Sequence, residues 1–231
     1  MEFKFYKSYL DLIEKEYSIR TFDRLTDFEK KLRQSKFRKF VLDTYGYTYS
    51  SILLLERTIL TGMIRPQRLL LDGDDYYLAC DMTTNTYYLN YKHLLMIDID
   101  FYKSTDANIP SVSVELFNRD VEDNPDNTWI LYRSKGGVHA FLISKEMDNR
   151  SKESCELMIK LKCDFNYVVY SYLRGWCVRL NRKKNEDKVI CEKICKIGQN
   201  KEIPGLEKLV NLHVRLIDVF KDEDPSMMYG V

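Results

Sequence analysis

The sequence predicts an α+β protein in which an N-terminal helical lobe, residues 1–62, packs on a mostly antiparallel sheet lobe, residues 63–231. Apolar residues of the first lobe recur every three or four positions, as they do along one face of a helix. Segments of the second lobe read as strands separated by turn residues. With 231 residues, 45% of them hydrophobic, the chain can bury one substantial core but not several large domains. The two lobes are therefore expected to form one compact unit.

The helical lobe is predicted from a helix start and from its apolar spacing. Thr26 followed by Glu29 is typical of a capping box at a helix N-terminus. Basic residues gather between Lys30 and Lys39, a pattern that usually indicates a solvated helix face. The residues that form the apolar rhythm are Phe28, Leu32, Phe37, Phe40 and Val41.

Strands are expected after Pro66, where the helical pattern ends. A hairpin turn is predicted at Thr83–Asn85, because strand-like runs flank it on both sides. An acidic, proline-containing loop is expected to run through Asp126, and Gly136-Gly137 is expected to split a second strand pair. The expected strands and helix are, in order, Tyr76–Cys80, Thr86–Leu89, Leu94–Phe101, Trp129–Arg133, Val138–Ser144 and a helix over 151–162.

Composition narrows the class of protein. A formal net charge of +1 does not by itself mark a nucleic-acid binder. No stretch approaches the roughly 18 apolar residues of a membrane span, and the start of the chain does not resemble a secretory signal. The six cysteines lack the paired spacing of a disulfide scaffold, so most are interpreted as reduced core residues, and Cys191 and Cys195 lack partners for a structural zinc. We expect an intracellular protein that is not secreted and does not contact membranes.

The first candidate site lies on the expected strand Leu94–Phe101. Strand alternation places Asp98 and Asp100 on one face and the apolar residues Ile97 and Ile99 on the other. Two ionised carboxylates at the end of a buried strand repel each other and lose hydration, so they call for a cation. Oxygen ligands suit Mg²⁺ or Mn²⁺, and two such ions about 4 Å apart can activate a hydroxyl group. A strand that ends in a solvated acidic turn is the alternative interpretation.

The second candidate site is the glycine turn and the strand that follows it. Gly136 and Gly137 permit a tight turn with exposed amides, and Ser134 and Lys135 add a hydroxyl and a cation. This combination indicates a phosphate-binding turn. His139 lies two residues further, on the returning strand. A simple hairpin with a structural histidine is the alternative.

The third candidate site combines Asp164 with the basic segment that follows it. Asp164 comes after the predicted helix and is a candidate third metal ligand. Arg179 lies within an apolar stretch, where an arginine without an anionic partner is costly. Together with Lys183 it could hold a triphosphate. An ordinary salt bridge from Arg179 to an aspartate is the alternative.

In this order, the three sites resemble the motifs of the archaeo-eukaryotic primase superfamily, also called primase-polymerases, over about residues 90–185. The resemblance implies a sheet lobe of primase catalytic-core type. The residues that it implies as catalytic metal ligands are Asp98, Asp100 and Asp164, with Asp187 as an alternative to Asp164. Those that it implies as nucleotide-binding are Ser134, His139, Arg179 and Lys183, and the glycine turn adds Lys135, Gly136 and Gly137 to this set.

The same resemblance implies an activity. A primase-type nucleotidyl transferase synthesises or extends an RNA or DNA primer on a single-stranded DNA template, using nucleoside triphosphates and two Mg²⁺ or Mn²⁺ ions. A helicase or an accessory replication subunit is an implied partner, and Lys30–Lys39 is a candidate template surface. The chain also resembles uncharacterised primase-like proteins of large DNA viruses, which implies action in the cytoplasm, in the nucleus or at a viral replication site.

Other functions stay open at the level of sequence. A catalytically degenerate, primase-like protein would bind nucleic acid or act as a scaffold without metals. A Mn²⁺-dependent glycosyltransferase also uses an Asp-x-Asp after an apolar strand, although the histidine hairpin would have no role there. A nuclease could use the same acids.

Overall fold

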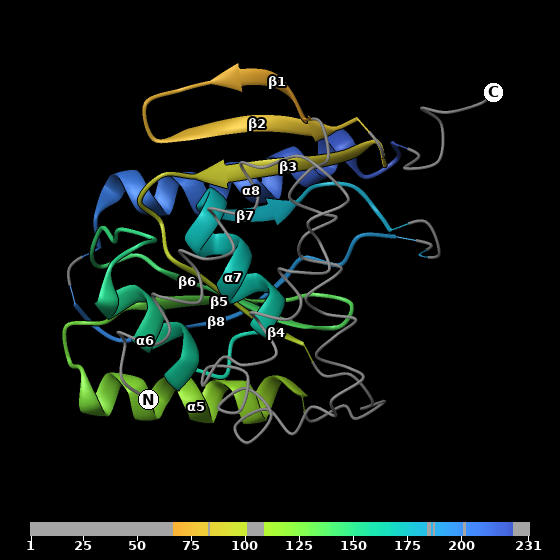
Figure 1. The fold of residues 1–231 in the computed structure, drawn as a ribbon. Helices are drawn as coiled ribbons and strands as arrows, with labels where there is room; N and C mark the ends of the chain where they lie inside the picture. The colour runs from red at the N-terminus through yellow and green to blue at the C-terminus, as the bar shows by residue number, and fades with distance from the viewer. Residues whose placement is uncertain are drawn as a thin grey trace, which may run out of the picture. The chain divides into compact units, whose positions relative to one another are not determined.

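The computed structural model describes residues 67–82, 84–100, 109–183, 186, 188–200 and 202–223. The predicted helical lobe, residues 1–62, and the basic run Lys30–Lys39 lie outside these residues. The described part forms an α+β domain, which confirms the predicted class for the second lobe (Figure 1). Its elements are β1 (Gln67–Asp72), β2 (Tyr76–Asp81), β3 (Thr86–Tyr91), β4 (Met96–Asp100), α5 (Ile109–Asp123), β5 (Trp129–Arg133), β6 (Gly137–Leu142), α6 (Lys152–Lys160), α7 (Phe165–Arg174), β7 (Trp176–Arg179), β8 (Glu192–Ile197) and α8 (Pro204–Phe220).

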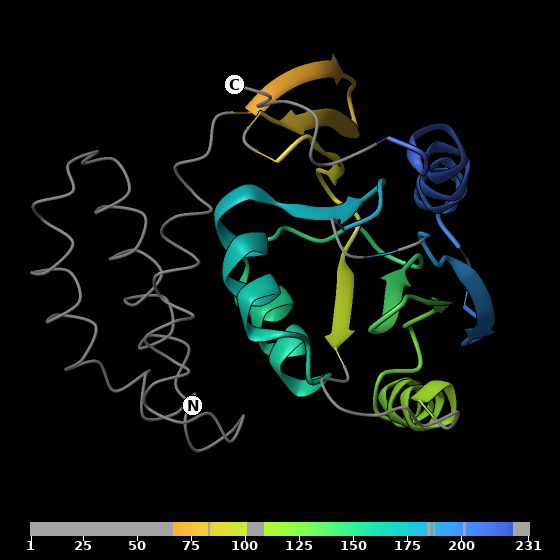
Figure 2. The ribbon, with the colours of Figure 1, turned by 90° about the vertical axis from the view of Figure 1, so that its right-hand side faces the viewer.

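Among the described residues, eight strands form two antiparallel sheets of four strands each. The first sheet has the order β1-β2-β3-β7, and the second has the order β4-β6-β5-β8. All the pairings are antiparallel, so the prediction of a mostly antiparallel lobe is confirmed. Each sheet receives its last strand from a later part of the chain, because β7 joins β3 and β8 joins β5. Figure 2 shows the two sheets and their helices from the side.

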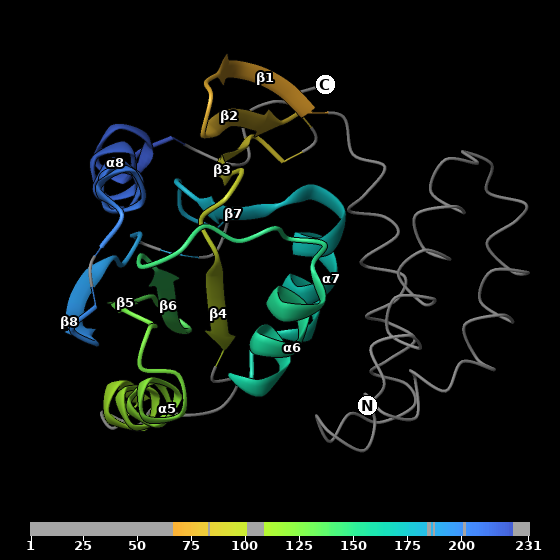
Figure 3. The ribbon, with the colours of Figure 1, turned by 90° about the vertical axis from the view of Figure 1, so that its left-hand side faces the viewer.

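The second sheet is buried on both faces. On one face, Phe117 of α5 packs on Trp129 of β5, with ring centroids 4.9 Å apart. On the other face, Phe141 of β6 meets His213 of α8 at 5.4 Å and Tyr91 of β3 at 6.1 Å. The sheet therefore lies between α5 and a layer formed by α8 and the first sheet, while α6 and α7 lie beside β4 (Figure 3).

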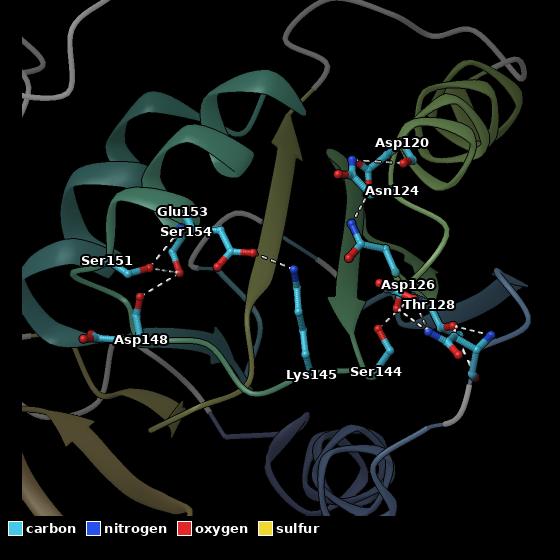
Figure 4. Close-up of polar contacts among 12 residues, drawn as sticks. Asp120, Asn124, Asp126, Thr128, Ser144, Lys145, Asp148, Ser151, Glu153 and Ser154 are labelled. Carbon is cyan, nitrogen blue, oxygen red and sulfur yellow. Dashed lines mark hydrogen bonds and ion pairs between the residues drawn. The ribbon is translucent and has the colours of Figure 1, made fainter.

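Most of the predicted local elements are confirmed. The hairpin joins β2 to β3 with Asp81 opposite Thr86, and the second pair of strands is β5 and β6. The predicted helix over 151–162 is α6, which begins after Ser151 because the Ser151 hydroxyl accepts the Ser154 N–H at 3.0 Å (Figure 4). No disulfide joins any of the six cysteines, and Cys80, Cys155 and Cys163 are buried. Within the described ranges, no helix is long and apolar enough to cross a membrane.

The predicted loop through Asp126 is wrong, because most of it is the 15-residue helix α5. The buried face of this helix includes Ser113, Phe117 and Asp120, which are spaced four and three residues apart. Two of these three residues are polar, so the apolar periodicity that normally reveals a helix is missing from the sequence. The helix is held by polar contacts as well as by Phe117.

A buried carboxylate ties α5 to its neighbours. Asp120 accepts hydrogen bonds from Asn127 Nδ2 at 2.7 Å, from Asn124 Nδ2 at 3.0 Å and from the Trp129 indole N–H at 3.0 Å. Figure 4 shows its contact with Asn124. The Lys160 ammonium of α6 lies 3.6 Å from the same carboxylate. Because this charge is fully buried, it depends on these donors for the solvation that it loses.

Replacing Asp120 with alanine is expected to lower the free energy of unfolding by about 3 kcal/mol, because buried donors on Asn127 and Trp129 lose their acceptor. Asp123→Ala is the matched control: Asp123 also contacts Lys160, at 2.9 Å, but its side chain is 66% exposed. That control should change stability by less than about 0.5 kcal/mol. Urea unfolding of both variants measures the difference, and equal losses would contradict the role of Asp120.

Candidate functional site

The first two predicted motifs meet where β4 pairs with β6. The register places Asp98 opposite His139, and Asp98 Oδ1 lies 3.5 Å from His139 Nε2. The backbone of Asp98 turns away from β6: its N–H donates to Cys163 Sγ at 3.4 Å, and its carbonyl accepts the Asp164 N–H at 2.6 Å. The two residues are therefore a non-hydrogen-bonded pair of the antiparallel ladder, in which side chains approach most closely.

The Asp98 carboxylate is poorly compensated. Its side chain is 23% exposed, but Oδ1 is buried and has no hydrogen-bond partner among the described residues. Burial, followed by the nearby charges of Asp100 and Asp164, raises the pKa of Asp98 well above its usual value, and Lys183 opposes this rise. Burial and Lys183 lower the pKa of His139 to about 4. His139 is therefore neutral at pH 7 and leaves the Asp98 charge without a cationic partner on β6.

The glycine turn lies directly against the acid pair. Asp100 is paired with Gly137, and the Ser134 N–H donates to the Gly137 carbonyl at 2.9 Å to close the turn. A Cβ at Gly137 would overlap the Ile99 carbonyl oxygen, whereas a Cβ at Gly136 would lie 3.4 Å from Asp100 Oδ1. Gly137 is therefore required for the close approach of β6 to β4. The predicted phosphate-binding role of the turn, with exposed Lys135, stays a prediction.

The third motif reaches the site through Asp164. This residue is the N-cap of α7, and its Oδ1 accepts the Tyr167 N–H at 3.1 Å. Asp164 also raises the pKa of Asp98 through its charge, so three acids share one region. The other proposed third ligand, Asp187, lies outside the described residues. Asp164 therefore has a structural role as a helix cap in addition to its predicted role as a metal ligand.

The two basic residues of the third motif, Lys183 and Arg179, have different surroundings. Lys183 pairs with Glu186 at 3.9 Å and affects the pKa of both Asp98 and His139, so it belongs to the site. Arg179 instead lies on β7 with its guanidinium 5.8 Å from the centre of the Tyr88 ring, and its Nη2 is 3.4 Å from the Tyr88 hydroxyl. Within the described residues no carboxylate pairs with Arg179. Its predicted contact with a triphosphate is untested.

Several residues near the site could not be selected from the sequence. Cys163 contacts the Asp98 backbone, and the Tyr167 hydroxyl exchanges two hydrogen bonds with the Cys177 backbone, both at 3.0 Å. His213 is fully buried beneath β5 and β6, with Nδ1 lacking a hydrogen bond among the described residues. The only signal in the sequence is that Cys163 directly precedes Asp164, the candidate third metal ligand.

The acid pair suits a divalent cation. Mg²⁺ is commonly held by one or two carboxylates together with waters and substrate phosphates. Asp98 and Asp100 could supply such carboxylates, and the buried Asp98 Oδ1 without a hydrogen bond among the described residues is an oxygen that an ion would satisfy. No three His, Cys, Asp or Glu side chains in the described ranges are already arranged as a metal site.

The fold and the site define an α+β domain with an aspartate-histidine pair on adjacent antiparallel strands. No protein-family model, curated protein or solved structure matches the chain. Its function must therefore be argued from the site.

Gly137→Ala is expected to lower the free energy of unfolding by about 3 kcal/mol, because the added Cβ overlaps backbone on β4 that cannot move aside. Gly136→Ala is the matched control, since its Cβ meets only the carboxylate end of Asp100. That variant should lose less than about 1 kcal/mol. Thermal or urea unfolding compares them, and a greater loss in Gly136→Ala would refute this packing argument.

His213 is expected to make stability depend on pH. Burial, followed by His139, lowers the pKa of His213 to about 3, so below pH 6.5 the unfolded chain binds a proton that the folded chain does not. Stability should therefore fall as pH falls from 6.5 to about 3, by at most about 1.4 kcal/mol per pH unit for this group.

His213→Phe should reduce that slope, because phenylalanine fills the site without titrating. His93→Gln, at an exposed position, should leave the slope unchanged. Urea unfolding at several pH values measures all three proteins. An identical slope in wild type and His213→Phe would exclude His213 as the origin of the pH dependence.

Proposed function

We propose that this chain is a nucleotidyl transferase of the primase type, which synthesises or extends an RNA or DNA primer on a single-stranded template. The observation that carries the proposal is the 3.5 Å approach of Asp98 to His139. The charges of Asp100 and Asp164 raise the pKa of Asp98, while Lys183 opposes that rise and lowers the pKa of His139. Acids, a neutral imidazole and a lysine within one region suit a nucleoside triphosphate and its metal ions.

In the proposed reaction, the 3′-hydroxyl oxygen of the primer bonds to the α-phosphorus of the incoming nucleotide. The bond from this phosphorus to the bridging oxygen breaks, pyrophosphate leaves and the hydroxyl proton passes to solvent. Asp98 and Asp100 would hold divalent ions, which, when bound, neutralise charge that develops on the phosphate oxygens.

Each side chain then has a separate task. His139, neutral at pH 7, can donate one N–H to a phosphate oxygen without competing as a cation for the aspartates. Lys183 adds a positive charge at an exposed position beside them. Asp164 contributes negative charge and fixes the start of α7. The proposal also includes a single-stranded DNA template and a helicase or an accessory replication subunit as partners.

Asp98→Asn is expected to reduce primer extension with Mg²⁺ or Mn²⁺ at least about a hundredfold, because it removes charge from the position that holds the ion. In metal-free buffer the same variant should be at least as stable as wild type, because the buried charge repelled by Asp100 and Asp164 is gone. Asp218→Asn, an exposed change on α8, is the control and should retain activity.

Extension of a labelled primer, with ribonucleotides and deoxyribonucleotides supplied separately, measures activity, and thermal unfolding in EDTA measures stability. Full extension by Asp98→Asn would refute the metal-ligand role. Release of nucleotides from DNA without added triphosphate would indicate a nuclease instead.

The second candidate is a degenerate primase-like protein that binds single-stranded nucleic acid or acts as a scaffold. One observation favours it: burial and two acidic neighbours raise the pKa of Asp98, which opposes the ionised form that a metal ligand needs. Strand binding that is equal in wild type and Asp98→Asn, together with no extension by either, would support this candidate.

A further inference from the structure

The edge of β4 that faces away from β6 is hydrogen-bonded at Asp98 to the segment that joins α6 to α7. Cys163 Sγ accepts the Asp98 N–H at 3.4 Å, and the Asp164 N–H donates to the Asp98 carbonyl at 2.6 Å. β4 is the end strand of the second sheet, and an end strand leaves the outward backbone groups of alternate residues without sheet partners. These two contacts satisfy both outward groups of the residue whose carboxylate faces His139.

The local conformation of this segment fixes the position of the thiol. Lys162, two residues after the end of α6, has a left-handed conformation with φ 55°. The Cys163 N–H reaches back to the Met158 carbonyl at 3.0 Å, which is the pattern of a Schellman motif. One residue later, Asp164 caps α7. The fully buried Cys163 side chain is thus fixed between the end of one helix and the start of the next.

We propose that Cys163 is a positioning residue, whose sulfur holds the Asp98 backbone so that the carboxylate stays opposite the His139 ring. In a non-hydrogen-bonded pair, no ladder bond to β6 fixes Asp98 itself, so its orientation depends on the opposite edge. Removing the sulfur would leave a buried N–H without an acceptor. The catalytic consequence of this positioning rests on the proposed function, whereas the positioning itself does not.

Amide hydrogen exchange tests the positioning directly. Cys163→Ala should accelerate exchange at the Asp98 amide about fivefold to tenfold relative to Ile97, because one hydrogen bond is lost. Ile97 is the internal reference, since alternation along the ladder directs its amide to Ala140 of β6. Cys163→Ser keeps an acceptor and should stay within about twofold of wild type. Cys155→Ala, at another buried cysteine, should not change the Asp98-to-Ile97 ratio.

Two exchange results would overturn the proposal. Equal acceleration at Asp98 and Ile97 in Cys163→Ala would mean that the sulfur only contributes to global stability. A Cys163→Ser protein that behaves like Cys163→Ala would mean that hydrogen-bond acceptance is not the relevant property.

Primer extension by the same variants tests the consequence. Cys163→Ala should lower kcat about tenfold with little change in template affinity, and Cys163→Ser should restore most of it. Unchanged kcat in Cys163→Ala, with active wild type, would overturn the catalytic role of the positioning. Inactive wild type would count against the proposed function, and the exchange ratio would still decide whether Cys163 positions Asp98.

Discussion

The structure around the candidate site depends on hydrogen bonds to the backbone groups on the outer edge of β4, the edge that faces away from β6. The connection between α6 and α7 bonds to both backbone groups of Asp98 through Cys163 and Asp164. Asp164 also begins α7, and Tyr167 in the first turn of that helix bonds to the Cys177 backbone on β7. These hydrogen bonds therefore link β4, the end strand of the second sheet, to β7, the end strand of the first.

Asp120 and Asp98 illustrate the difference between structural and functional use of a carboxylate. Asp120 is surrounded by donors from Asn124, Asn127 and Trp129, so its charge is compensated within the fold. Asp98 has a buried oxygen without a hydrogen bond among the described residues, two acidic neighbours and a neutral histidine. Stability alone does not explain the second arrangement, and uncompensated groups of this kind concentrate at functional sites.

The sequence was informative where the determinants are local. The alternation of Asp98 and Asp100 with buried Ile97 and Ile99, the β2–β3 hairpin and the start of α6 all follow from short patterns. Helix α5 does not follow from the sequence, because its buried polar residues Ser113 and Asp120 interrupt the apolar periodicity. The role of Gly137 depends on how close β6 lies to β4. The role of Cys163 depends on the register between the same two strands. No local sequence pattern specifies either.

The order in which the chain visits its two sheets has a consequence for folding. It builds β1 to β3 in the first sheet, crosses to β4, β5 and β6 in the second, returns for β7 and then crosses again for β8. Neither sheet is complete until most of the domain has been synthesised, and both final pairings join residues distant in sequence. Such nonlocal pairing slows folding. On the ribosome, the strands that carry the acids and the histidine should therefore await the C-terminal segments, and no contiguous half of the domain is expected to fold alone.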